Sequence, residues 1–137
     1  MKSALFLLPG MLLLACASPK LSKRVPGTWF IDHYNEWTAD TSTGHALDST
    51  GYLTFHKNGT GEIRLIPGRP HGAFSDYYPS GNADFRWHLR DSFVVITDRA
   101  GHTQQEWLVT SNYDIYMAWV SVNSAGDSVR TLYLYKQ

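Results

Sequence analysis

Short apolar or alternating runs, separated by turn residues, are the feature that most constrains the fold of this chain. In residues 83–89, Phe85, Trp87 and Leu89 share one face, and the other face carries the polar residues Asp84, Arg86 and His88. Asn58-Gly59 separates two such runs, and Asn-Gly is a strong β-hairpin signal because both residues tolerate positive φ. No window of a dozen residues has the apolar spacing of a helix. The pattern therefore predicts an all-β fold.

The expected strands lie at residues 28–34, 52–56, 61–66, 74–78, 83–89, 92–97, 103–110, 115–122 and 128–135. So many short strands favour an antiparallel up-and-down β-barrel of eight or nine strands, because closure removes exposed strand edges. A two-sheet β-sandwich is the alternative, since both folds bury every second side chain. Residues 38–49 are polar, have no apolar period and are expected to form a long loop.

The N-terminus has the features of an export signal. Lys2 precedes an apolar run at residues 4–14, which is too short to cross a bilayer. The following Leu-Leu-Ala-Cys sequence, ending at Cys16, resembles the lipobox of bacterial lipoproteins. This resemblance implies cleavage before Cys16, acylation of its thiol and anchoring in a membrane, with the bacterial outer membrane as the expected location. The alternative is an ordinary cleaved signal peptide in which Cys16 is incidental.

The chain therefore divides into a signal peptide (1–15), a lipid anchor with a flexible tether (16–25) and one β-barrel domain (26–137). Cys16 is the only cysteine, so no disulfide framework is expected. Lys and Arg number 12, as do Asp and Glu, and this balance argues against nucleic acid as a partner. Contact with a membrane is expected only through the N-terminal lipid.

Three stretches resemble the signatures of the lipocalin family, in the same order along the chain. They are GTWF at 27–30, SNYDIY at 111–116 and LYLYK at 132–136. The second departs from the family pattern, which has Thr-Asp where this chain has Ser-Asn. The resemblance implies a lipocalin-like barrel in which a basic residue of the last strand, Lys136 or alternatively Arg130, lies over Trp29. With Gly27 allowing a tight entry to the barrel floor, this cation–π pair would close the barrel.

Inward-facing apolar residues of the later strands are the candidates for lining a ligand site. They are Phe85, Trp87, Trp107, Val109, Met117, Trp119 and Leu132. A barrel of about eight strands either fills itself or holds one small ligand. The first interpretation predicts a protein that binds a fatty acid or another small hydrophobic molecule. The second predicts a solid barrel whose exposed tyrosines, such as Tyr77 and Tyr78, contact a protein or glycan.

The sequence holds little that indicates catalysis. The six histidines show no His-x-His or His-x-x-x-His spacing, and no Gly-x-Ser-x-Gly motif is present. Cys16 is consumed by the expected acylation. We therefore expect no enzymatic activity, no catalytic residue, no metal site and no cofactor.

Overall fold

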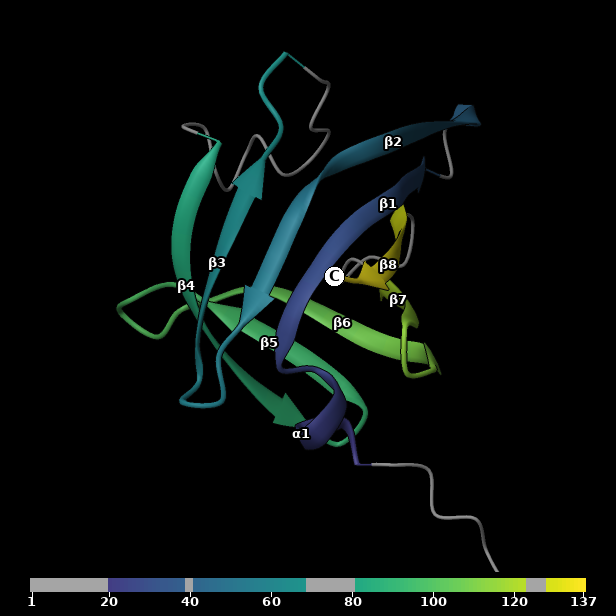
Figure 1. Cartoon of the computed structure of the whole chain (residues 1–137). Coiled ribbons are helices and arrows are strands. Elements are labelled where there is room, and N and C mark those ends of the chain that lie inside the picture. The colour runs from purple at the N-terminus through teal and green to yellow at the C-terminus, as the bar shows by residue number, and fades with distance from the viewer. Residues whose placement is uncertain (1–19, 39–40, 69–80, 123–127) are drawn as a thin grey trace, which may run out of the picture.

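The computed structural model describes residues 20–38, 41–68, 81–122 and 128–137, which form a short helix and eight strands (Figure 1). In chain order these are α1 (Leu21–Arg24), β1 (Gly27–Thr38), β2 (Thr41–Phe55), β3 (Thr60–Leu65), β4 (Asn82–Arg90), β5 (Phe93–Thr97), β6 (Thr103–Asn112), β7 (Tyr116–Val122) and β8 (Ser128–Lys136). The expected signal peptide, Cys16, the strand expected at 74–78, and Tyr77 and Tyr78 lie outside the described residues.

The eight strands form one closed antiparallel barrel in which each strand pairs with its neighbours in the sequence. β1 closes the ring because it pairs with β2 on one side and with β8 on the other. Trp29, for example, lies opposite both Leu53 and Lys136. This topology confirms the predicted all-β, up-and-down barrel and excludes the two-sheet sandwich.

The turn between β2 and β3 lies at the expected Asn-Gly pair. Gly59 has a φ of 84°, which a residue with a Cβ rarely adopts. The side-chain Oδ1 of Asn58 accepts hydrogen bonds from the backbone N (3.0 Å) and the hydroxyl (2.6 Å) of Thr60. These local bonds fix the reversal of the chain at this point.

The prediction of a long loop at residues 38–49 is wrong, because β2 begins at Thr41 and pairs with the second half of β1. The paired segment is irregular, with register shifts between Ile31 and His33 and between Glu36 and Thr38. Ser49, where the expected loop would end, has a φ of 53°. Alternation of apolar residues appears only where a strand face packs on a core, so backbone pairing alone leaves no such signal in the sequence.

One end of the barrel, which we name the α1 end, carries the helix and three turns. Because the strands alternate in direction, the turns β2–β3, β4–β5 and β6–β7 lie at the same end as the start of β1 (Figure 1). The segment 17–25 was expected to be a flexible tether, yet residues 21–24 form a helical turn and Val25 is fully buried. Among the described residues, no helix has both the length and the hydrophobicity to span a bilayer.

Candidate functional site

The centre of the barrel is filled by large side chains. The ring of Phe55 lies 5.4 Å from Phe85, 5.4 Å from Trp87 and 5.6 Å from Trp119, measured between ring centroids. These tilted and edge-on contacts are the favoured arrangements of aromatic pairs. Trp119 and Leu132 have exposed fractions of 0 %, so no water-sized space adjoins them. The barrel is therefore packed at this level rather than hollow.

The α1 end is closed around Trp29. Its indole Nε1 donates a hydrogen bond to the carbonyl of Val25 (2.8 Å), and the Nζ of Lys136 lies 5.3 Å from the centroid of its ring. Gly27 has a φ of 133°, and a Cβ there would lie 3.1 Å from Cε of Lys136. These contacts join the entry to β1 with the last residue of β8.

Arg130, the alternative cation for Trp29, lies elsewhere. The register of β1 and β8 sets Lys136 opposite Trp29 and Arg130 opposite Glu36, further from the α1 end. Arg130 Nε lies 3.8 Å from Glu36 Oε1, and Glu36 Oε2 accepts a hydrogen bond from the hydroxyl of Tyr34 (2.7 Å). Arg130 therefore joins the first and last strands as well, but through a carboxylate rather than through the indole.

The candidates for lining a ligand site divide into two groups. Five of them are buried in the packed centre, namely Phe85, Trp107, Met117, Trp119 and Leu132. Two of the indoles there have partners inside the barrel, since Nε1 of Trp107 donates to Oε1 of Gln105 (2.8 Å) and Nε1 of Trp119 lies 3.4 Å from Sδ of Met117. Trp87 and Val109 instead lie near the α1 end, where each lines a hollow.

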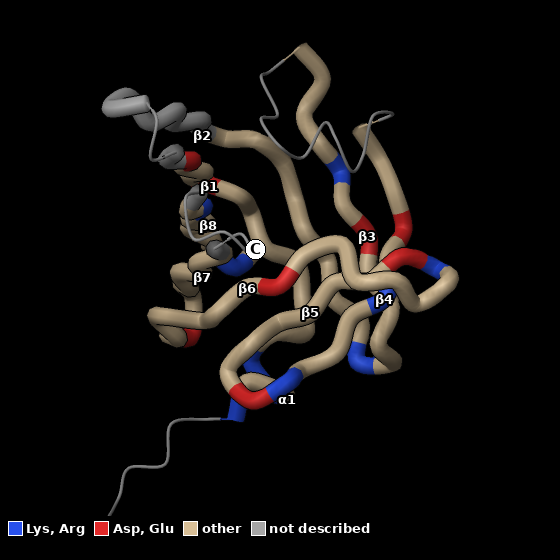
Figure 2. Tube along the Cα trace, turned by 180° about the vertical axis from the view of Figure 1, so that it is seen from behind, with Lys and Arg blue, Asp and Glu red and all other residues tan. Residues whose placement is uncertain are grey.

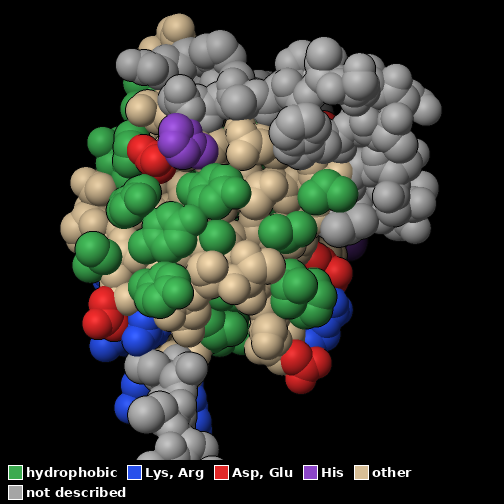
Figure 3. All heavy atoms as spheres, turned by 90° about the vertical axis from the view of Figure 1, so that its right-hand side faces the viewer, with side chains coloured by type: hydrophobic (Ala, Val, Ile, Leu, Met, Phe, Trp, Pro, Cys, Tyr) green, Lys and Arg blue, Asp and Glu red, His purple; other side chains and the backbone are tan. Residues whose placement is uncertain are grey.

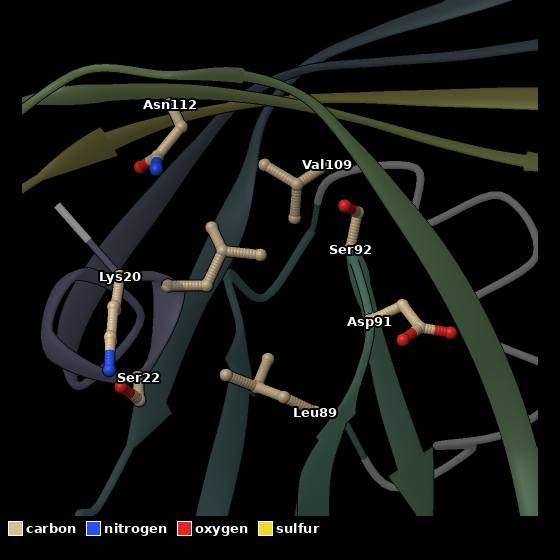
Figure 4. Close-up of a pocket in the computed structure, with 8 residues that line it drawn as sticks. Lys20, Ser22, Leu89, Asp91, Ser92, Val109 and Asn112 are labelled. Atoms are coloured by element: carbon tan, nitrogen blue, oxygen red, sulfur yellow. The ribbon is translucent and has the colours of Figure 1, made fainter. Parts of the chain in front are cut away.

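The larger hollow at the α1 end has a volume of about 480 Å³ (Figure 4). Leu21, Leu89 and Val109 are its apolar residues, and each packs against the barrel core. In Figure 4, Lys20 and Ser22 lie on one side of the hollow and Asp91 and Ser92 on the other. The full lining is Lys20, Leu21, Ser22, Leu89, Asp91, Ser92, Val109 and Asn112.

A second hollow of about 410 Å³ shares Ser22 and Leu89 with the first. Its other lining residues are Pro26, Lys57, Gly59, Trp87 and His88. We call the two together the α1 groove, because Ser22 of α1 lines both. The indole Nε1 of Trp87 donates to the carbonyls of His56 and Thr60, each at 3.0 Å, so its polar edge is occupied and the ring adds apolar surface.

The α1 helix forms one wall of the groove and is held in place by the two terminal nitrogens of the Arg24 guanidinium. Its Nη2 lies 3.0 Å from Oδ1 of Asp114, and its Nη1 donates to the carbonyl of Asn112 (2.9 Å). Leu21 and Val25 lie one helical turn apart, and the backbone N of Val25 donates to the carbonyl of Leu21 (2.8 Å). Both side chains face the barrel, which explains why a segment of four residues is helical.

Leu21 is the groove residue that sequence reasoning missed most clearly. Its signal was the spacing of four between Leu21 and Val25, which places two apolar side chains on one face of a helical turn. Leu89 was assigned to the core face of its strand but not to a site. Within the described part of the chain, no group of three or more His, Cys, Asp or Glu side chains is placed to hold a metal ion.

The arrangement of the groove suits the binding of a small amphipathic molecule. The half-buried Leu21, Leu89 and Val109 form the base, while the exposed rim carries an ammonium group, a carboxylate and hydroxyl groups. A site of this composition buries the apolar part of a ligand and orients its polar part.

Comparisons with known proteins do not define a family. Protein-family models give no match, and curated proteins give none either. Among solved structures, a redesigned β-barrel is similar with a TM-score of 0.44 and 13 % identity, over 85 % of this chain and 94 % of that one. A deswapped triple mutant of bovine odorant binding protein gives a TM-score of 0.42 and 14 % identity, over 83 % of this chain and 74 % of that one. The fold assignment therefore rests on the closed strand pairing of this chain itself.

Proposed function

We propose that this protein is a lipid-anchored protein of the bacterial cell envelope that binds one small hydrophobic molecule, such as a fatty acid, in the α1 groove. Its activity in this proposal is binding rather than catalysis. The observation that carries the proposal is an open hollow of about 480 Å³ with an apolar base and a polar rim. Volumes of roughly 300–1,000 Å³ are usual for small-molecule sites.

The chemistry of the rim supports an anionic head group. Lys20 lies at the groove and supplies a cation that could contact a carboxylate or phosphate. Leu21, Leu89 and Val109 would contact the acyl chain, and each buried methylene contributes about 0.8 kcal/mol. The groove replaces the barrel centre as the proposed site, because the part of the centre that the structure describes is filled by aromatic side chains.

A fatty-acid titration tests this site through tryptophan emission. Trp87 lines the groove and is 9 % exposed, whereas Trp119 is fully buried. We expect a saturable change in emission with oleate, and a rise in melting temperature by mass action. The change should largely disappear in Trp87→Phe. A response that persists in Trp87→Phe and disappears in Trp119→Phe would place the ligand in the barrel centre instead.

A matched pair of charge substitutions locates the binding surface. Leu89→Asp puts a carboxylate in the base of the groove, next to the expected acyl chain, and should weaken oleate binding by about tenfold or more. Leu108→Asp is the control, because Leu108 is exposed on the outside of β6. Equal affinities for the two variants would contradict the groove as the site, provided that circular dichroism shows both to be folded.

The anchoring part of the proposal is tested by Cys16→Ser. Serine cannot form the thioether that carries the diacylglycerol, and stable anchoring needs more than one acyl chain. The wild-type chain should fractionate with membranes and carry the mass of its acyl groups. A serine variant that is cleaved at its signal and still stays with the membranes would contradict the lipobox interpretation.

A second candidate function follows from the packed centre of the barrel. Here the protein is a solid envelope module that contacts a protein or a glycan through exposed aromatic side chains. The exposed Tyr52, Tyr113 and Tyr135 favour this alternative, whereas Tyr77 and Tyr78 lie outside the described residues. Absence of any saturable response to fatty acids, phospholipids and isoprenoids, with no thermal stabilisation, would favour the solid module.

A further inference from the structure

The α1 end carries an excess of positive charge although the whole chain has none. Figure 2 shows basic residues gathered around the helix. The basic residues of the α1 end are Lys20, Lys23, Arg24, Lys57, Arg90 and Lys136, and the acidic residues there are Asp91, Glu106 and Asp114. Six basic residues against three acidic ones leave this end positive, although Lys and Arg equal Asp and Glu over the complete sequence.

Three lysines of this end are not neutralised by the ion pairs found there. Arg24 pairs with Asp114 (3.0 Å), and Arg90 pairs with Glu106 (3.0 Å). No ion pair in the described residues involves Lys20, Lys23 or Lys57. All three are exposed, so their charges are available to an anionic surface.

Exposed hydrophobic side chains lie beside these charges. The β6–β7 turn places Tyr113 and Ile115 at the α1 end with exposed fractions of 65 % and 67 %. Tyr116 lies next to them on β7, with its ring centroid 6.3 Å from that of Tyr113 and 5.2 Å from that of Tyr135. Figure 3 shows hydrophobic side chains gathered over one face of the barrel, above basic residues. Tyr113 and Ile115 thus form a contiguous exposed patch with Tyr116 and Tyr135, and such a patch suits a contact outside the barrel.

We propose that the α1 end rests on an anionic phospholipid surface, with Lys20, Lys23 and Lys57 at the phosphates and with Tyr113 and Ile115 in the head-group layer. Tyrosine is enriched at this depth because its ring is apolar and its hydroxyl is polar. Lysine near an anionic leaflet is attracted to it over a distance of one Debye length.

The lipid proposed at Cys16 would lie near the α1 end, and in this respect the inference rests on the proposed anchor. Cys16 precedes Lys20 by four residues, which span at most roughly 14 Å when fully extended. An acylated Cys16 would therefore hold the α1 end close to the bilayer. The α1 groove would then face the lipid, so its ligand would enter from the membrane rather than from water.

The charge of this end also argues against a second copy of the chain as its occupant. Two such ends brought together would place their uncompensated lysines in contact, and like charges repel. Self-association remains an outcome that the experiment below can detect.

Hydroxyl-radical footprinting of the mature acylated protein in lipid nanodiscs tests the proposal. One preparation of discs contains half phosphatidylglycerol, and the other contains phosphatidylcholine alone. We expect the oxidation of Tyr113 and Ile115 to be at least about threefold lower in the anionic discs, because charge draws the end onto the lipid. Leu108 and Tyr52, which are exposed on the barrel wall, should be oxidised equally in both.

Charge reversal gives the matched variant. The double substitution Lys23→Glu and Lys57→Glu should abolish the protection in anionic discs, whereas Lys23→Arg with Lys57→Arg should retain it. Melting temperatures would show that both proteins are folded. Equal oxidation of Tyr113 in the two types of disc would overturn the proposal. Protection that depends on protein concentration and not on lipid would overturn it in favour of self-association.

Mass spectrometry of the same preparation distinguishes a failure of this inference from a failure of the proposed anchor. If the mass spectrum shows no acyl groups, the anchor proposal fails, and anionic vesicles are then added in excess to the unacylated chain. Protection of Tyr113 and Ile115 by those vesicles would still support the lipid contact. Its absence would overturn the contact, whatever the state of Cys16.

Discussion

At the scale of single residues, Trp29 has the most connected position in the barrel. Its ring is fully buried, its Nε1 bonds to Val25, and Lys136 lies over its face. The indole thus links the segment before β1, β1 itself and the end of β8. The order of the short motifs predicted the pairing of a tryptophan with a late cation, but the choice between Lys136 and Arg130 needed the strand register.

Removing the indole should therefore be costly. We expect Trp29→Ala to lower the free energy of unfolding by about 3–5 kcal/mol, since it leaves a large cavity and an unpaired carbonyl at Val25. Trp29→Phe keeps most of the packing and should cost clearly less. Urea unfolding of the three proteins measures both effects. A loss below about 1 kcal/mol for Trp29→Ala would show that the ring does not support the barrel end.

Gly61 illustrates a close approach between two strands. A Cβ at this position would lie 2.3 Å from Cε2 of Phe85 and 2.6 Å from the carbonyl of Thr54. Gly61→Ala should therefore destabilise the fold by about 1–3 kcal/mol. In the background of Phe85→Leu, where the ring is absent, the same substitution should cost less. A double-mutant cycle from urea unfolding gives the coupling, and additive effects would contradict a clash with the Phe85 ring as the cause.

At the scale of elements, the outer face of β7 and β8 forms an aromatic cluster. Tyr116 stacks on Tyr133 with centroids 6.3 Å apart and an angle of 25° between the rings. Burial, followed by the charges of Tyr133, Tyr135 and Asp32, raises the pKa of Tyr116 above its usual value of 10.0. The cluster therefore favours the protonated phenol.

This raised pKa predicts how stability changes in alkali. The unfolded chain loses the Tyr116 proton at a lower pH than the folded chain does. The contribution is fully present below pH 10 or so and is lost as pH rises through the folded pKa. Urea midpoints between pH 8 and 11 should fall more steeply for the wild type than for Tyr116→Phe. Parallel curves for the two proteins would contradict a role for this phenol.

The elements also show why some of the fold could be predicted from the sequence and some could not. β4, with Phe85, Trp87 and Leu89 on its inner face, has the alternation that a half-buried strand requires. The first half of β2 has no such pattern, because pairing with β1 involves backbone groups that every residue has. The four-residue α1 is too short for any period, and only its docking against the barrel stabilises it.

The sequence did not predict the α1 groove either, because no local pattern encodes it. Leu21, Leu89 and Val109 come from three distant parts of the chain, and the hollow depends on where α1 lies across the barrel end. That placement is set by Arg24, through Asp114 and the carbonyl of Asn112. Neither contact has a local sequence signature.

At the scale of the whole molecule, the β1–β8 pairing decides whether the barrel exists. A chain without residues 128–137 would leave β1 and β7 with open edges and would lose Leu132 and Leu134 from the core. We expect this truncated chain to lack cooperative thermal unfolding. Adding a peptide of residues 128–137 should restore it in part, which circular dichroism can follow. Full cooperativity without the peptide would mean that an open sheet is stable.

The β1–β8 pairing also sets an order of events during biosynthesis. A chain made and threaded from its N-terminus delivers Trp29 and Tyr34 first, and their partners Lys136 and Leu132 almost last. Until β8 is available, one edge of β1 has no strand to pair with. Pairings between segments so distant in sequence also form slowly. The incomplete chain would thus stay unfolded for as long as its end is withheld. In the export proposed above, late folding would keep the chain unfolded while it passes through a translocation pore, since the barrel cannot close before β8 has followed.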